Sequence, residues 1–350
     1  MKKERFKPDW PIIGNIPITD FLEKSVNQPA DKQDNQRIQG TYIFAGPEYL
    51  GKFNAAVYFA KSLLCQNVHS GEKDFPCGAC ASCNILRNGQ IDGHGDFFVL
   101  SREEDKKNIS IEQVRDFITK LNMSSFGGFY KVGIINIAEK LSEKALNALL
   151  KTLEEPKKNT ILILVTHDID SLPKTILSRS QILNFKLVKQ ADIYDYLFHK
   201  CHATRDDAKK FSRICIGRPR LAVKLMEDAD ALSAHEKKVD IFFNFFHQDI
   251  NNRMLAISEL LPNKTVGQNL ASLAFDILQV WNGAIRDMLL FDCGCGSITQ
   301  NEVFLSRIQT INLSSKRILK LNQSIKDGLE ALSANVNPRL VLENIAINII

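Results

Sequence analysis

A glycine-rich loop near the start of the chain constrains its fold more than any other feature. Residues 46–53 read Gly-Pro-Glu-Tyr-Leu-Gly-Lys-Phe, which matches the pattern G-x-x-x-x-G-K of a phosphate-binding P-loop. The loop follows the strand-like run 41–45 and opens the helical stretch 54–64, which is the context that a P-loop requires. The pattern therefore predicts a P-loop sheet in which Gly46, Gly51 and Lys52 form the phosphate-binding turn.

The residues that would bind magnesium and activate water are missing from this pattern. Phe53 stands where a P-loop has a serine or threonine, and a phenyl ring cannot ligate a cation. The third expected strand ends in Asn136 and Ile137, where a P-loop ATPase has an acidic residue for the magnesium shell and a glutamate that orients water. Glu139 could be that acid in a shifted register, but we expect it to lie past the strand end and to face away. We therefore expect no magnesium, no hydrolysis, and at most weak ATP binding through Lys52.

The length and composition of the chain are sufficient for two or three domains with hydrophobic cores. It has 350 residues, of which 44% are hydrophobic and 24% are charged. No apolar run approaches the roughly 20 residues needed to span a bilayer, and the first residues do not resemble a signal peptide. We therefore expect a soluble cytoplasmic protein without a membrane partner. The net charge of +5 is too small to indicate a nucleic-acid-binding protein by itself.

Strand and helix patterns alternate through the first half of the chain, and the second half is almost wholly helical. Short apolar runs predict buried parallel strands at 42–45, 97–100, 132–136, 161–166 and 182–185. Ser110 and Gln113 stand in capping-box positions at the start of one intervening helix. The alternation predicts an α/β fold with a parallel, doubly wound sheet. We expect this core over residues 1–187, a group of three short helices over 188–230, and a helical domain over 231–350.

Four cysteines have the spacing of a metal site. Cys77, Cys80 and Cys83 form a C-x-x-C-x-x-C run, and Cys65 lies shortly upstream at the end of the post-loop helix. Because the cytoplasm keeps thiols reduced, these cysteines predict a structural zinc site rather than disulfides. A ferredoxin-type iron–sulfur run begins in the same way, but its fourth cysteine and the following proline are missing here. His69 or His94 could replace Cys65 as the fourth ligand.

The combination of these motifs resembles the AAA+ subunits of the bacterial DNA polymerase III clamp loader. The resemblance runs from about residue 10 to residue 227 and rests on the loop 46–53, the cysteine module 65–90, the run 147–156 and the run 176–180. It implies a P-loop sheet domain with a small zinc module, a three-helix lid and a C-terminal helical collar for oligomerisation. The degraded loop and strand end are most similar to the family member that does not hydrolyse ATP. The family's Ser-Arg-Cys triplet is Ser178-Arg179-Ser180 in this chain, which retains the arginine.

The resemblance also implies roles for individual residues and partners. Arg179 occupies the place of an arginine finger that reaches the ATP site of a neighbouring subunit, and its fixed guanidinium donors suit transferred negative charge. Arg220 resembles the arginine that senses bound phosphate, and Thr166 occupies the corresponding polar sensor place. The implied partners are the ATPase subunits gamma and tau and the delta subunit in a hetero-oligomer, with the sliding clamp and primer-template DNA reached through the complex.

Two other functions fit parts of the pattern. The chain could be a working ATPase motor of the same superfamily that tolerates an unusual loop, in which case the isolated chain would hydrolyse ATP. It could instead be a zinc-dependent DNA-binding protein, but the sequence has no basic stripe with interleaved aromatic residues. We therefore expect a binding and scaffolding subunit.

Overall fold

The protein forms two compact units in a computed structural model. The structure describes residues 10–27, 39–67, 76–87, 93–103, 106, 108–127, 130–154, 157–261, 270–300, 304–311 and 313–349. One unit contains residues 1–192 together with 218–220, and the other contains residues 193–217 and 221–350. The expected boundaries at residues 187 and 230, which separate a lid from a collar, stay predictions.

The first unit contains a five-stranded sheet with helices on both faces. Its elements are α1 (Ile16–Asn27), β1 (Thr41–Ala45), α2 (Lys52–Leu64), α3 (Ala81–Arg87), β2 (Phe97–Leu100), α4 (Ile111–Leu121), β3 (Lys131–Asn136), the short 3-10 helix η3 (Ala138–Lys140), α5 (Glu143–Glu154), β4 (Thr160–Thr166), α6 (Lys174–Leu177) and β5 (Gln181–Asn184). The strand order is β2-β3-β4-β1-β5, and every pairing is parallel. All five strands that the sequence predicts are confirmed, with boundaries that differ by one residue at most.

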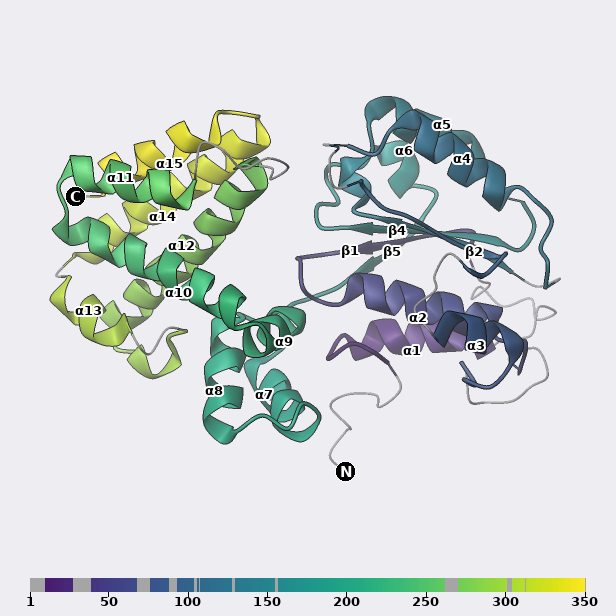
Figure 1. The fold of residues 1–350 in the computed structure, drawn as a ribbon, viewed down its shortest axis with the longest axis horizontal. Coiled ribbons are helices and arrows are strands. Elements are labelled where there is room, and N and C mark those ends of the chain that lie inside the picture. Colours follow the sequence, from purple (N-terminus) through teal and green to yellow (C-terminus); the bar gives the residue numbers. More distant parts are fainter. Residues whose placement is uncertain are drawn as a thin grey trace. The chain divides into compact units, whose positions relative to one another are not determined.

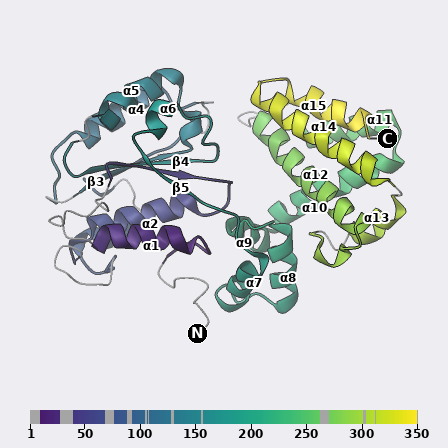
Figure 2. The same cartoon turned by 180° about the vertical axis from the view of Figure 1, so that it is seen from behind.

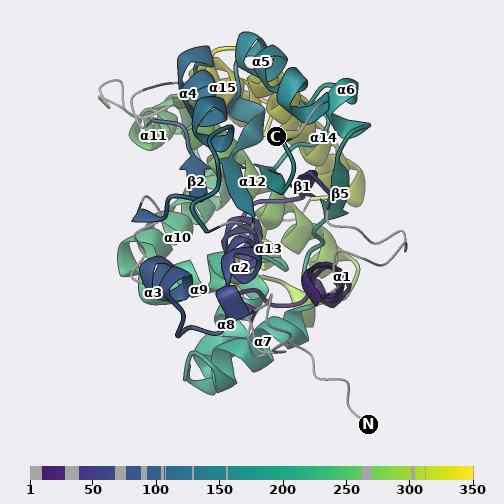
Figure 3. The ribbon, with the colours of Figure 1, turned by 90° about the vertical axis from the view of Figure 1, so that its right-hand side faces the viewer.

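The two faces of the sheet carry separate hydrophobic cores. Figure 1 shows α1, α2 and α3 on one face of the sheet and α4, α5 and α6 on the other. Alternate residues of β1 serve the two layers, because successive side chains of a strand point to opposite faces. Tyr42 and Phe44 belong to the core beneath α1 and α2, whereas Ile43 and Ala45 belong to the core beneath α4 and α5. Figure 3 shows α2 between α3 and α1.

Local signals explain why several helices begin where they do. The Ser110 side chain accepts from the Gln113 backbone N–H, and the Gln113 side chain accepts from the Ser110 N–H, so the expected capping box of α4 is confirmed. The sequence patterns do not predict α1 or α3, and the C-terminal helix α15 (Pro338–Ile347) lies within the expected helical domain without being predicted individually. In α1 the apolar residues Ile18, Leu22 and Val26 are all buried at helical spacing.

The second unit is entirely helical in its described part. Its helices are α7 (Gln190–His199), α8 (Arg205–Ile214), α9 (Pro219–Glu227), α10 (Ala229–Asn244), α11 (Ile250–Leu260), α12 (Leu270–Asp292), α13 (Leu305–Thr310), α14 (Ser315–Ser333) and α15. Helices α12, α14 and α15 contact one another, and Figure 2 shows α14 and α15 lying alongside each other. Their core includes Trp281, whose indole N–H donates to the Lys238 carbonyl at 3.0 Å. None of the described helices is both long enough and apolar enough to cross a bilayer.

Candidate functional site

The strand register places the predicted nucleotide-binding residues at one edge of the sheet. Ala45, the last residue of β1, pairs with Thr166, and Asn136, the last residue of β3, pairs with Val165. The loop that begins at Gly46 therefore leaves the sheet beside the ends of β3 and β4. This is the carboxyl edge of a parallel sheet, where ligands bind in folds of this kind.

Both loop glycines are required by the backbone. Gly46 has a φ of 133°, and a Cβ at this position would lie 2.3 Å from the carbonyl oxygen of Phe185. Gly51 precedes α2 with a φ of 85°, and its Cβ would lie 2.8 Å from Cγ2 of Ile12. Positive φ values favour glycine, and these two contacts exclude any side chain. The glycine pattern therefore reflects packing as well as phosphate chemistry.

Lys52 is bound by its own loop. Its ammonium donates to the carbonyl oxygens of Gly46 and Pro47, at 2.6 Å each, and lies 3.4 Å from Nδ1 of His167. The side chain is only 3% exposed. Burial lowers the pKa of Lys52 from 10.5 to about 8, against the opposing effects of Glu139 and Glu48. A lysine ammonium has three N–H donors, and these three acceptors engage all of them, so none is left for a phosphate.

His167 completes this arrangement as a neutral side chain. Burial, together with the positive charges of Lys52 and Lys140, lowers the pKa of His167 to about 4. The ring is therefore neutral at neutral pH, and since the Lys52 ammonium can only donate, Nδ1 is the acceptor and the ring hydrogen resides on Nε2. Its Nε2 lies 3.7 Å from Glu48 and 3.9 Å from Glu139, but these contacts are not ion pairs because the ring carries no charge.

The positions that bind magnesium and activate water in a P-loop ATPase are occupied here by Phe53, Asn136 and Ile137. Phe53 is partly buried and packs against the core beneath α1 and α2. Asn136 is half-buried at the end of β3, and Ile137 follows it with a φ of 61° and a ψ of 58°. This left-handed conformation is rare for a β-branched residue. It turns the chain sharply at the strand end, immediately before η3.

The expectation that Glu139 faces away is wrong. One carboxylate oxygen of Glu139 lies 2.8 Å from the hydroxyl of Thr166 and 3.4 Å from the backbone N–H of His167. The turn at Ile137 directs Glu139 back toward the end of β4. A carboxylate therefore does lie at this edge of the sheet, where it accepts hydrogen bonds from strand-end donors.

Sequence reasoning missed His167 and Glu48 as members of this site. His167 directly follows Thr166 at the end of β4, and the expectation that strand ends converge at one edge was the signal that could have included it. Glu48 lies within the loop itself, at a position where the P-loop pattern allows any residue.

The two arginines singled out by the resemblance lie in different surroundings. The backbone N–H of Arg220 donates to the carbonyl of Tyr49 at 3.0 Å, which places this residue beside the loop. Arg179 lies between α6 and β5, and its side chain is 40% exposed. Its guanidinium contacts the Glu154 carboxylate at 3.2 Å and donates to the Thr175 carbonyl at 3.0 Å. Within the chain it therefore forms a surface ion pair, which contributes at most about 1 kcal/mol to stability.

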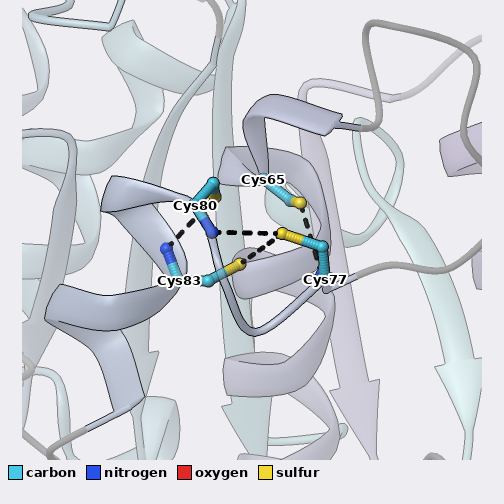
Figure 4. Close-up of side chains that lie close together, drawn as sticks. All are labelled: Cys65, Cys77, Cys80 and Cys83. Atoms are coloured by element: carbon cyan, nitrogen blue, oxygen red, sulfur yellow. Dashed lines mark hydrogen bonds between the residues drawn. The ribbon is translucent and has the colours of Figure 1, made fainter.

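The four predicted cysteines come together in a cage. Their sulfur atoms all lie within 4.8 Å of one another, and the sulfurs of Cys77 and Cys83 are 3.9 Å apart. Figure 4 shows the four side chains gathered around one point, Cys65 from the end of α2 and the others from the loop before α3 and from α3 itself. A tetrahedral zinc ion with Zn–S bonds of about 2.3 Å separates its sulfurs by roughly 3.8 Å. The cage therefore fits a zinc ion.

Backbone N–H groups favour thiolates in this cage. Cys77 Sγ accepts from the N–H groups of Ala79 at 3.5 Å and Cys80 at 3.3 Å. These donors lower the pKa of Cys77 to about 7. Burial has the opposite effect on Cys65 and Cys83 and raises the pKa of both thiols. A metal ion would overcome that burial penalty, because it binds the deprotonated form.

The alternative fourth ligands are not supported. His94 uses Nδ1 to accept from the Asp96 N–H at 3.1 Å, and its Nε2 lies 3.1 Å from the hydroxyl of Ser82. Both ring nitrogens of His94 are therefore engaged outside the cage. His69 lies outside the described residues. Within the described part of the chain, Cys65 supplies the fourth sulfur.

Comparison with known proteins gives matches to subunits of DNA polymerase III. Residues 22–189 match a family model described as "DNA polymerase III, delta subunit". The delta' subunit of DNA polymerase III from Pseudomonas aeruginosa is 39% identical over 138 residues, which cover 39% of this chain and 40% of that protein. The tau subunit from Bacillus subtilis is 28% identical over 306 residues, which cover 81% of this chain and 50% of that protein. The chain thus aligns with half or less of the length of these relatives.

A solved structure of a DNA polymerase III gamma-subunit-related protein from Thermotoga maritima aligns with 95% of this chain and 98% of that chain, with 17% identity and a TM-score of 0.47.

The five-stranded parallel sheet and its glycine loop define a P-loop protein fold. Within this fold, the family match over residues 22–189 and the relatives support a member of the clamp-loader subunit family of DNA polymerase III.

Proposed function

We propose that this chain is a delta-prime-like clamp-loader subunit that does not hydrolyse ATP. In this function it assists its partners in the ATP-dependent loading of a sliding clamp onto primed DNA during replication. The partners are the ATPase subunits gamma and tau and the delta subunit of a hetero-oligomeric complex. The 39% identity to a delta' subunit supports this assignment, although it covers less than half of each chain.

The bonding of Lys52 carries this proposal. Its three donors are engaged by Gly46, Pro47 and His167, so the loop satisfies its lysine without a nucleotide. The carboxylates of Glu48 and Glu139 lie near the same lysine and would repel phosphate groups. Phe53 offers no oxygen to magnesium, and Asn136 and Ile137 offer no carboxylate. Binding a nucleotide here would require the loop to release Lys52 without gaining a metal ion in return.

The experiment that tests the absence of catalysis uses the full chain alone. We expect ATP hydrolysis at background level and no saturable binding of Mg-ATP by calorimetry. Phe53→Ser restores a hydroxyl at the magnesium position, but it leaves Lys52 bound to its loop, so we expect it to remain inactive. Saturable Mg-ATP binding accompanied by turnover of the unmodified chain would refute the proposal.

We propose that Arg179 acts in trans as an arginine finger on the ATP site of a neighbouring subunit. It is accessible for such a contact, because its side chain is 40% exposed and its contacts among the described residues are the exposed Glu154 carboxylate and the Thr175 carbonyl. Arg179→Ala should lower ATP turnover of the assembled complex, and Arg179→Lys should fail to restore it because lysine lacks the fixed fork of donors. Arg115→Ala, at an exposed arginine on α4, is the matched control.

A further variant separates this trans role from the ion pair within the chain. Glu154→Gln removes the carboxylate that holds Arg179 but keeps the arginine, so turnover of the complex should persist. Equal turnover of the complexes with wild type and with Arg179→Ala would exclude the finger role. In this proposal the two residues at the sensor positions stabilise local structure. The Thr166 hydroxyl donates to the Glu139 carboxylate, and the backbone N–H of Arg220 donates to the Tyr49 carbonyl in the loop.

The second candidate function is an active motor subunit similar to gamma or tau. The position of Glu139 favours it, because this carboxylate lies at the strand-end edge and interacts with Lys52. The match to the Bacillus subtilis tau subunit also covers more of this chain than the delta' match does. Turnover by the isolated chain that Glu139→Gln abolishes would establish this function in place of the first.

We propose that the cysteine cage holds one structural zinc ion through Cys65, Cys77, Cys80 and Cys83. Bound zinc would join the end of α2 to α3 and to the residues directly before α3 through the four sulfurs. Because such a site needs reduced thiols, the proposal also places the chain in the cytoplasm. We expect about one zinc and no iron per purified chain. Metal analysis that finds neither metal, with all four thiols freely reactive, would refute the site.

A further inference from the structure

His94 connects the cysteine cage to the sheet. Its Nε2 lies 3.1 Å from the hydroxyl of Ser82, which stands on α3 between the cage residues Cys80 and Cys83. Its Nδ1 accepts from the backbone N–H of Asp96 at 3.1 Å, next to the start of β2. One imidazole ring therefore spans from α3, which carries Cys83 and directly follows Cys80, to the edge strand of the sheet.

The hydrogen bonds define which nitrogen of His94 carries the proton. The Asp96 N–H can only donate, so Nδ1 is the acceptor and bears no hydrogen. In a neutral imidazole the hydrogen then resides on Nε2, which donates to the Ser82 hydroxyl. The backbone N–H of Asp96, on the sheet side, thus determines the orientation of the His94 ring. The N–H at Nε2 of the ring then points to α3.

Asp96 gives this connection a rigid base. It is 1% exposed, and its carboxylate accepts from the Ser125 hydroxyl at 3.0 Å and from the backbone N–H groups of Phe126 and Gly127 at 3.0 and 2.9 Å. The ammonium of Lys131, itself 3% exposed, lies 3.8 Å from the same carboxylate. A residue held by four separate partners cannot shift without breaking several of them. Its backbone N–H therefore presents a fixed donor to His94.

Helix α3 has few other anchors to the sheet domain. It is seven residues long, too short to be stable by itself, and Leu86 is its buried apolar contact with the core under α1 and α2. Apart from the cage, the contact between His94 and Ser82 is its polar link to the sheet among the described residues. Among the described residues, the side chain of Asn84 donates to the Ala79 carbonyl at 3.0 Å, within the module.

We propose that His94 is a positioning residue for the four-cysteine site. His94 holds α3 through Ser82, so that Cys80 and Cys83 keep the orientation required for metal binding. This inference rests on the zinc site proposed above. His94 acts through Ser82 and does not touch the metal. Groups that orient metal ligands in this way typically change metal affinity about 10–100-fold when they are removed.

The test measures zinc release from the zinc-loaded full chain into a chromogenic chelator, and the absorption spectrum of the cobalt(II)-substituted chain. We expect His94→Ala and Ser82→Ala each to accelerate release roughly 10–100-fold and to alter the cobalt spectrum. Since both variants break the same hydrogen bond, the double variant should be no faster than either single one. His247→Ala, at an exposed histidine in the other compact unit, is the matched control and should match wild type.

Two conservative variants separate positioning from a general loss of structure. His94→Asn places an acceptor near the position of Nδ1 but no donor near Nε2, so it should release zinc as fast as His94→Ala. His94→Gln places an amide donor near the position of Nε2, so it should recover slow release in part. Thermal unfolding of each variant would show whether the sheet domain remains folded.

The outcomes distinguish this inference from the zinc site itself. A wild-type chain without bound zinc would overturn both. A chain that binds zinc, but whose His94→Ala and Ser82→Ala variants release it at the wild-type rate, would overturn only the role of His94. His94→Ala could also release zinc faster while His94→Gln releases it just as fast and Ser82→Ala releases it at the wild-type rate. That result would likewise exclude positioning through Ser82.

Discussion

The buried lysine of the loop predicts a specific dependence of stability on pH. Lys52 is 3% exposed, and its pKa falls from 10.5 to about 8 on burial. Between these two values the folded chain has released the proton while the unfolded chain still holds it. Because the unfolded state then binds more protons, the free energy of unfolding rises with pH across this window.

The size of the effect follows from the difference between the two pKa values. A change from 10.5 to about 8 corresponds to on the order of 3 kcal/mol, at about 1.4 kcal/mol for each pH unit. Lys52→Met removes the titrating group together with its hydrogen bonds to Gly46 and Pro47. The stability of wild type relative to Lys52→Met should therefore increase by roughly 3 kcal/mol from pH 7 to pH 10.5, with most of the increase above pH 8.

The assay is urea-induced unfolding of wild type and variant at several pH values, fitted with a separate transition for each compact unit. The comparison with Lys52→Met cancels other groups that titrate in the same range. Lys61→Met, at a half-buried lysine on the same helix, is the matched control. A difference between wild type and Lys52→Met that stays constant within about 1 kcal/mol over this window would refute the burial of the ammonium in its loop.

Three further substitutions test other buried or capping interactions. Asp96→Asn leaves the ammonium of Lys131 without its carboxylate, so the free energy of unfolding should fall by about 3–5 kcal/mol. Adding Lys131→Met should recover part of this loss, and strictly additive losses would contradict the pairing. Arg253→Met removes donors from the carbonyls of Ala346 and Ile349 at the end of α15, so stability should fall by about 2–3 kcal/mol and amide exchange in α15 should accelerate; wild-type protection of α15 would contradict this. Ser110→Ala removes half of the capping box of α4 and should cost about 1 kcal/mol in thermal unfolding, whereas an unchanged midpoint would exclude the cap.

The strands and the cysteine cage were predictable because each depends on a local pattern. A buried parallel strand is a short run of apolar residues, as in β4, where every residue from Thr160 to Thr166 is buried. The cage depends on cysteine spacing along a single stretch of chain, and the four sulfurs meet as that spacing predicts. The helix α15 was harder to recognise, because apolar residues such as Leu340 lie on its exposed face and obscure the periodicity.

The details of the nucleotide site could not be predicted because they depend on backbone turns that the residue types do not indicate. Ile137 adopts a left-handed conformation that isoleucine rarely takes, and only this turn directs Glu139 back to Thr166. The P-loop pattern places Lys52 beside the loop, but it does not specify that the carbonyls of Gly46 and Pro47 point at its ammonium. Long-range packing decides both features.

The two glycines of the loop have a consequence for how such chains change over time. Any side chain at Gly46 collides with the Phe185 carbonyl, and any side chain at Gly51 collides with Ile12. Correct folding alone would therefore require both glycines even in a chain without nucleotide chemistry. A protein of this architecture therefore keeps the glycine pattern together with its fold. The residues that distinguish a hydrolysing subunit from a non-hydrolysing one must be sought at the neighbouring positions, where packing leaves the choice of side chain open.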